Sequence, residues 1–205
     1  MRSEANAVAL RSLEEPLNPM IGPRGKVFRD PVHGLIRIEG GDEFIIDLIN
    51  TPEFQRLRRV RQLGVSSFTY PGAEHTRFAH SLGVFNFAQR IVASLQRRYA
   101  GEKELTLVLD DQRRNVLAAA LLHDVGHGPF SHMIERAFER SADHEKKTVA
   151  LIQDGGAITD CLEAHKSIPR QWRILSEKHQ NTGSWWILSA ASSMPTGWII
   201  SCATP

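Results

Sequence analysis

Leu121–Met133 reads L-L-H-D-V-G-H-G-P-F-S-H-M, and Arg77–Val84 reads R-F-A-H-S-L-G-V. Both strings fall in the stretch from His75 to His144, which holds six of the nine histidines of the chain. Imidazoles placed beside an acid in an apolar helix are costly to bury unless they bind something. The two strings therefore predict a site for a metal ion and a phosphate group.

Helical patterns surround both strings. Apolar residues recur on one side of a long helix predicted over Phe78–Leu95. Gly101–Asp111 is expected to connect it to a helix over about Asn115–Val125, which the string G-H-G-P ends. Two further helices are predicted over Phe130–Phe138 and His144–Gln153.

The residues before these helices predict a hairpin and two more helices. Lys26–Ile38 has β-prone runs on either side of D-P-V-H-G, and Asp42–Asn50 is apolar enough for a buried helix. Thr51 and Pro52 are typical of an N-cap and a first helical position, and apolar residues then repeat at helical spacing as far as Leu63. The predicted fold class is all-α, a helical bundle with a small N-terminal β-hairpin.

Composition divides the chain into three parts. Residues 1–24 are polar and broken by proline and glycine, which predicts a mobile leader. Residues 25–165 carry the patterned segments and are expected to form one domain. The patterning degrades over residues 166–205.

Overall composition is that of an ordinary globular protein, with 41% hydrophobic and 23% charged residues. The net charge of +2 is too small to indicate a nucleic-acid partner by itself, and the basic cluster Arg56–Arg61 is interpreted as a solvated helix face. Two cysteines, Cys161 and Cys202, suit a reducing compartment. No apolar run approaches the roughly 18 residues of a membrane span, and no secretory signal is recognised. A cytoplasmic protein is expected.

His123, Asp124 and His80 are the candidate metal ligands. His123 and Asp124 are neighbours and can both reach one ion lying against their predicted helix, while His127 lies one turn further on the same face. His80 would come from a separate, facing helix. Imidazole and carboxylate ligands suit iron, manganese, zinc or nickel. A structural zinc is disfavoured because such sites use cysteine thiolates. Each histidine alone is more often an ordinary residue, but their combined order is hard to obtain from packing.

Longer strings carry a family resemblance. D-P-V-H-G, T-P-E-F-Q-R-L-R, Y-P-G-A-E-H-T-R-F-A-H-S-L-G-V and L-L-H-D-V-G-H-G-P-F-S-H, over about residues 25–155, resemble the HD superfamily of metal-dependent phosphohydrolases. They are most similar to its deoxynucleoside triphosphate triphosphohydrolase (dNTPase) branch. The resemblance implies that residues 25–165 are an HD domain. It also implies an enzyme that hydrolyses a dNTP to a deoxynucleoside and intact triphosphate, by water attack at the α-phosphorus.

The resemblance also implies roles for individual residues. His80, His123 and Asp124 fall on metal ligands, and magnesium could accompany the substrate. His144, in the string D-H-E, falls on the histidine expected to act as general acid toward the leaving group.

Four residues are expected to contact the nucleotide. Gln62 and Arg77 match positions near its α-phosphate and sugar, where arginine can make bidentate phosphate contacts. His127 and His132 match histidines that line the phosphate path, and both are expected to assist catalysis.

An effector site is implied as well. Lys26, Gln55 and Arg58 match residues through which some members bind an activating guanine nucleotide. Asn50 stands where a regulated member has an acidic residue.

The tail departs from the family pattern. Members carry a fourth metal ligand, an aspartate in a string resembling Q-L-D-A-D-R-M-D-Y-L-L-R-D, which this chain lacks. Codons for Met194–Ile199 read one base earlier permit D-A-D-R-M-D. A single frame change near residues 181–184 is therefore expected, with loss of the C-terminal part and weaker metal binding, and a genuinely divergent C-terminus is the alternative.

Three alternatives stay open. One is a hydrolase or phosphodiesterase of other nucleotides, and another is a non-catalytic remnant that binds nucleotides or nucleic acid. The third is a truncated product without a function of its own. Assembly into a homo-oligomer is also left open.

Overall fold

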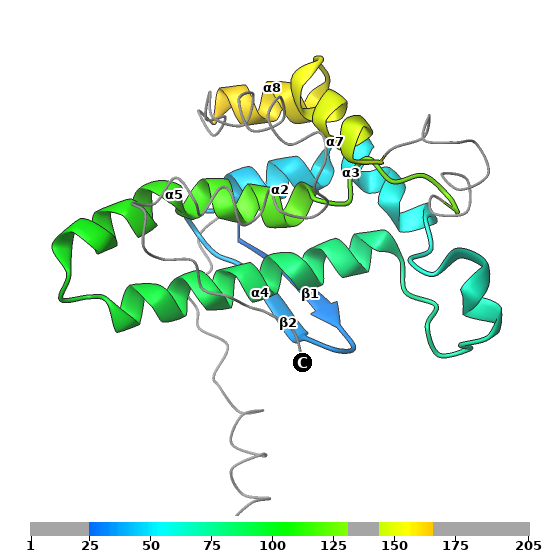
Figure 1. Ribbon diagram of the computed structural model, residues 1–205, viewed down its shortest axis with the longest axis horizontal. Coiled ribbons are helices and arrows are strands. Elements are labelled where there is room, and N and C mark those ends of the chain that lie inside the picture. The colour runs from blue at the N-terminus through cyan, green and yellow to red at the C-terminus, as the bar shows by residue number, and fades with distance from the viewer. Residues whose placement is uncertain (1–24, 131–143, 166–205) are drawn as a thin grey trace, which may run out of the picture.

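The computed structural model describes residues 25–130 and 144–165. The leader 1–24, the segment 131–143 and the tail 166–205 lie outside the described residues, and with them most of the helix predicted over Phe130–Phe138. In Figure 1 the two long helices α4 (Arg77–Arg98) and α5 (Lys103–Leu122) lie side by side, the hairpin lies against α4, and α7 and α8 lie beyond α2. The predicted fold, a helical bundle with an N-terminal β-hairpin, is confirmed.

The hairpin consists of β1 (Lys26–Asp30) and β2 (Gly34–Ile38), paired antiparallel. The Asp30 carboxylate shapes its turn by accepting hydrogen bonds from the amides of Val32 and His33, at 2.9 and 2.8 Å. Gly34 closes the turn with a φ of 72°, which glycine adopts without strain. Local turn chemistry therefore fixes this element, as the sequence predicts.

Helix α2 (Glu43–Asn50) is followed directly by the short helix α3 (Pro52–Gln55). The Thr51 hydroxyl accepts a hydrogen bond from the amide of Phe54, so the predicted N-cap is confirmed.

The prediction that helical structure continues to Leu63 is wrong after Arg59. A 3-10 turn, η1 (Arg56–Arg59), follows α3, and the backbone is extended at Val60. The Val60 carbonyl accepts from the amide of Arg77, and Arg61 pairs with Thr76. The chain turns away here because its backbone hydrogen bonds are made with the start of α4.

Helix α4 confirms the predicted long helix, and the Thr76 hydroxyl caps it by accepting from the amide of Ala79 at 3.3 Å. The limits predicted for the next helix are wrong at both ends. Helix α5 begins twelve residues early, at Lys103, because residues 103–111 lack proline and glycine and follow a short connection. It ends at Leu122, after which the chain forms turns in which the amides of Val125 and His127 donate to carbonyls three residues back.

Helix α7 (His144–Gln153) is present as predicted, and α8 (Ala157–Ala164) was not predicted. The Glu53 carboxylate, which comes from α3, accepts a hydrogen bond from the amide of Ala157 at 3.0 Å. The first turn of α8 therefore receives its capping group from a distant part of the chain.

One apolar core joins the hairpin and the helices. Its fully buried members include Ile38, Phe54 and Phe85, together with the run L-A-A-A-L-L at the end of α5. A helical segment with apolar residues on every side is buried on every side, because none of its faces favours contact with water. This end of α5, which leads into the H-D string, is therefore enclosed by the core.

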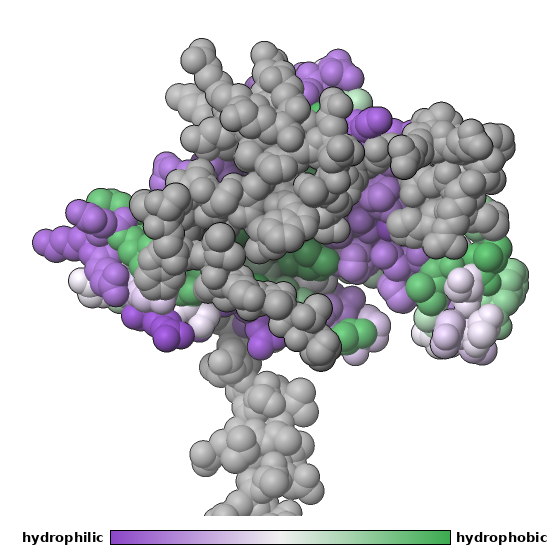
Figure 2. Space-filling model, viewed as in Figure 1, coloured by the Kyte–Doolittle hydropathy of each residue, from purple (hydrophilic) through white to green (hydrophobic). Residues whose placement is uncertain are grey.

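Apolar residues also reach the surface. Figure 2 shows apolar colour around η2 (Gly64–Phe68), where Val65 and Phe68 are 47% and 85% exposed. Among the described residues, none of the helices is both long enough and apolar enough to cross a membrane.

Candidate metal centre

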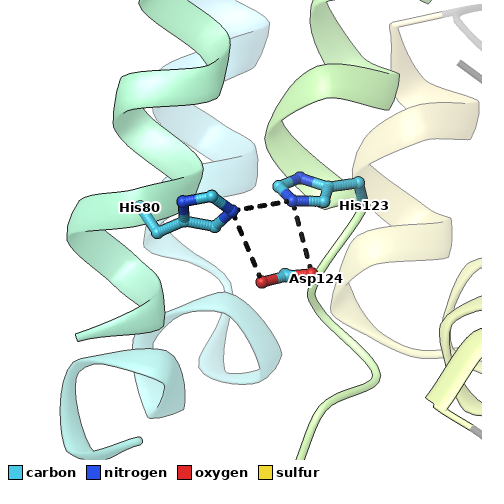
Figure 3. Close-up of side chains that lie close together, drawn as sticks. All are labelled: His80, His123 and Asp124. Carbon is cyan, nitrogen blue, oxygen red and sulfur yellow. Dashed lines mark hydrogen bonds and ion pairs between the residues drawn. The ribbon is translucent and has the colours of Figure 1, made fainter. Parts of the chain in front are cut away.

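Three predicted metal ligands converge in the structure. His80 comes from the first turn of α4, whereas His123 and Asp124 follow the last turn of α5 (Figure 3). The Nε2 atoms of His80 and His123 lie 3.3 Å apart. The Asp124 carboxylate oxygens lie 3.8 Å from His80 Nε2 and 3.3 Å from His123 Nε2. One ligand atom from each residue therefore lies within 4.8 Å of the others.

These separations fit a divalent cation. Ligand atoms at about 2.1 Å from one ion lie roughly 3.0 to 3.4 Å from one another in octahedral or tetrahedral geometry. His123 Nδ1 lies 3.0 Å from the Ala120 carbonyl oxygen, and donation of its proton there leaves the Nε2 lone pair facing His80 and Asp124. Two imidazole nitrogens and a carboxylate on one side of an ion leave its remaining positions open to water or substrate. The donor set therefore suits a catalytic type of site.

Asp124 is held ionised by its surroundings. Its side chain is 10% exposed, and the Arg77 guanidinium, at 3%, donates to Oδ2 at 2.7 Å. Burial by itself raises the pKa of Asp124, but its electrostatic interactions with His123, His127, Arg77 and His80 outweigh the burial and hold the pKa below its ordinary value. The carboxylate is thus in the form that binds a cation.

His80 is held neutral. Burial lowers the pKa of His80, and the attraction of Asp124 opposes this effect only in part. A neutral imidazole is the form that binds a metal ion.

His127 and His144 lie beside this centre, but the predicted position of His127 is wrong. It was expected on the same helix face as His123, whereas it lies in the turn after α5, because the helical hydrogen bonds end at Leu122. Its Nδ1 is nevertheless 3.7 Å from the Asp124 carboxylate. The rings of His127 and His144 are in contact, with centroids 3.8 Å apart and planes tilted by 43°, so α7 places His144 next to His127.

The predicted nucleotide contacts have different environments. The Gln62 side-chain oxygen is buried without a hydrogen-bond partner among the described residues, and its backbone amide donates to the His75 carbonyl. Arg77 is turned inward to Asp124, and its Nε is likewise buried and unpaired within residues 25–130 and 144–165. His132 lies outside the described residues.

The three residues matched to an effector site are linked by two phenylalanines. The Arg58 guanidinium lies 3.6 Å from the centre of the Phe78 ring, and Lys26 Nζ lies 5.1 Å from that of Phe28. The two rings are 6.3 Å apart, and Gln55 accepts a hydrogen bond from Arg58 Nε at 2.8 Å. The structure therefore brings the three side chains into one neighbourhood.

Sequence reasoning missed the groups that hold the turn after α5. Arg56 belongs to the cluster interpreted as a solvated face, yet its guanidinium donates to the carbonyl oxygens of Val125 and His127. The Thr148 hydroxyl accepts from the amide of Gly126 at 2.9 Å. Neither contact has a signal in local sequence, because both join positions far apart in the chain.

Comparison with known proteins gives the family. The model of the HD domain matches residues 77–183, which is more than half of the chain. The chain belongs to the HD domain family. His80, His123 and Asp124 all lie within the matched HD domain residues.

Related proteins extend the likeness beyond the HD domain match. The uncharacterized protein YwfO of Bacillus subtilis is 50% identical over 127 residues, covering 62% of this chain and 27% of YwfO. The human deoxynucleoside triphosphate triphosphohydrolase SAMHD1 is 38% identical over 158 residues, covering 71% of this chain and 24% of SAMHD1. A crystal structure of a phosphohydrolase from Bacteroides thetaiotaomicron superposes with a TM-score of 0.57 at 35% identity, covering 72% of this chain and 36% of that one. The chain thus spans about a sixth to two fifths of the length of the curated relatives it matches.

Proposed function

We propose that this chain is a metal-dependent phosphohydrolase of nucleotides, and that its substrates are dNTPs, which it converts to deoxynucleoside and triphosphate. The observation that carries the proposal is the convergence of His80, His123 and Asp124 from two helices within 4.8 Å. Similarity to relatives named deoxynucleoside triphosphate triphosphohydrolase supports the choice of substrate.

The residues have complementary tasks in this reaction. A divalent ion held by the three ligands would polarise a phosphoryl oxygen and lower the pKa of water. Arg77 keeps Asp124 ionised and oriented. The His127–His144 pair, of which His127 lies beside Asp124, can donate a proton to the leaving oxygen, the role assigned to His144. Gln62 offers a buried amide for the nucleotide, and His132 is kept in the proposal by the resemblance alone.

The ligand atoms favour manganese, iron, zinc or nickel as the resident ion, with magnesium accompanying the substrate. A guanine-nucleotide effector bound by Lys26, Gln55 and Arg58 also stays a prediction. The same holds for a cytoplasmic location and for assembly into a homo-oligomer.

The test is triphosphate release from panels of dNTPs and ribonucleotides, with each of these metals in turn. Asp124→Asn should lower turnover by more than the roughly 100-fold that loss of a group behind a metal ligand costs. Asp110→Asn, an exposed aspartate on α5, is the matched control and should leave turnover unchanged. Release of monophosphate or diphosphate instead of triphosphate would refute the dNTPase assignment and favour a phosphohydrolase of another nucleotide class.

A second candidate is a nucleotide-binding protein without turnover. It is favoured by the absence from the sequence of the aspartate string expected to supply a fourth ligand. Nucleotide binding measured by calorimetry, with no release of triphosphate at saturating manganese, would establish this candidate and exclude the first.

We also propose that residues 166–205 include a tail produced by a frame change, which accounts for the missing string. The HD domain match ends at residue 183, next to the region 181–184 where the change is expected, and this supports the idea. The encoding DNA tests it directly, because a neighbouring frame without Q-L-D-A-D-R-M-D-Y would refute the frame change.

A further inference from the structure

The turn Val125–Gly128 follows α5 and is held from two sides. It carries His127 and directly follows the ligand Asp124. The groups that hold it come from η1 on one side and from α7 on the other.

Arg56 supplies the first side. Its Nη1 donates to the His127 carbonyl oxygen at 2.6 Å and its Nη2 donates to the Val125 carbonyl oxygen. A planar guanidinium can bind two carbonyls at fixed spacing, which a lysine ammonium cannot do. Arg56 therefore fixes both the position and the orientation of the turn.

Thr148 supplies the second side. It is 4% exposed, and its hydroxyl accepts the hydrogen bond from the amide of Gly126. A Cβ on Gly126 would lie 2.2 Å from the His144 carbonyl oxygen and 2.4 Å from the Thr148 amide. The backbone of the turn thus lies directly against the first turn of α7, with no room for a side chain between them.

We propose that Arg56 and Thr148 are positioning residues that hold the turn against α7 and so set the spacing of the His127–His144 ring pair. The two rings are in contact, with centroids 3.8 Å apart, so a shift of the turn would change their separation directly. The contacts of Arg56 and Thr148 are with backbone atoms, so both act through the turn. The catalytic consequence rests on the proposed function, whereas the structural consequence does not.

The decisive variants are substitutions of Thr148. Thr148→Val keeps the shape and removes the acceptor, while Thr148→Ser keeps the acceptor. Thr159→Val is the matched control, because the buried Thr159 hydroxyl donates to the Ile152 carbonyl at 3.0 Å, at the opposite end of α7. On the other side of the turn, Arg56→Lys is compared with Arg59→Lys, since Arg59 is exposed.

The first measurement uses NMR on the metal-free chain. The mutual ring-current shifts of His127 and His144 and the protection of the Gly126 amide from exchange should be present in the wild type. Thr148→Val should lose both, and Thr148→Ser and Thr159→Val should keep them. If Thr148→Val does not fold, the spectra of the wild type test the proposal. An unprotected Gly126 amide or the absence of ring-current shifts in the wild type would overturn it.

The second measurement uses turnover with the nucleotide and metal identified above. Thr148→Val should lower kcat by about 10- to 100-fold with little change in KM, as expected when reacting groups are displaced by up to about 1 Å. Thr148→Ser should have a kcat close to that of the wild type, and the kcat of Arg56→Lys should be lower than that of Arg59→Lys. Equal kcat in Thr148→Val and Thr159→Val would overturn the proposal. If the wild type has no turnover, the proposed function fails and NMR alone decides the positioning role.

Discussion

Replacing Arg77 by methionine should destabilise the metal-free chain and make it more dependent on manganese. The Arg77 and Asp124 side chains are 3% and 10% exposed, and their charged atoms are 2.7 Å apart, so water screens the pair weakly. Methionine keeps much of the apolar volume of the arginine side chain but leaves the carboxylate without the guanidinium that donates to it at 2.7 Å.

The size of the effect follows from what remains around Asp124. Breaking a buried ion pair costs about 3–5 kcal/mol, because one charge is left buried and uncompensated. Here the imidazoles of His80, His123 and His127 stay within 3.8 Å of the carboxylate and can take up part of the deficit. We therefore expect a loss of about 2–3 kcal/mol, which lowers the urea midpoint by roughly 1 M at the usual urea dependence for a domain of this size.

The assay is urea unfolding with and without manganese, with Arg90→Met as control, because Arg90 is an exposed arginine on the same helix. Manganese at about 100 times its dissociation constant adds about 2.7 kcal/mol to a folded state that alone binds it. It should stabilise Arg77→Met more than the wild type, since the cation replaces the missing charge. An Arg77→Met chain within about 0.5 kcal/mol of Arg90→Met without metal would refute the buried-pair reasoning.

Three further predictions concern other groups. Because burial lowers the pKa of His80, the unfolded chain holds a proton there that the folded chain does not, so stability falls as the pH drops below about 6.5. His80→Gln should flatten this fall, and an unchanged pH dependence of the urea midpoint would contradict it. Glu53→Ala removes the acceptor of the Ala157 amide, so hydrogen exchange in the first turn of α8 should accelerate, and unchanged protection would count against the cap. Arg113→Met leaves the buried Asp42 carboxylate without its ion-pair partner. Because Arg113 is one-third exposed, water screens the pair in part, and we expect the free energy of unfolding measured by calorimetry to fall by about 2 kcal/mol. An unchanged melting temperature would refute this.

Elements defined by local chemistry were predictable from sequence. The hairpin depends on the Asp30 turn, α3 on the Thr51 cap, and α4 on a long apolar stripe, and each of these signals lies within or next to its element. Convergence of His80 with the H-D pair was also predictable, because two separated strings pointed to one ligand set.

Features that depend on distant partners were not predictable. The helical spacing through Leu63 is interrupted because the Val60 carbonyl is bound by the Arg77 amide. Arg56 looks like one more surface arginine until the turn after α5 is folded against it. The Arg77–Asp124 pair was missed for the same reason, since nothing near either residue in sequence indicates that they meet.

The bond between Glu53 and Ala157 joins residues 104 positions apart. Helix α8 is only eight residues long, well short of the roughly 12–15 residues at which isolated helices become marginally stable in water. Its stability therefore depends on packing against α2, α3 and α7, and not on its own sequence alone. A nascent chain emerging from the ribosome would need α2 and α3 in place before the first turn of this helix could gain its cap.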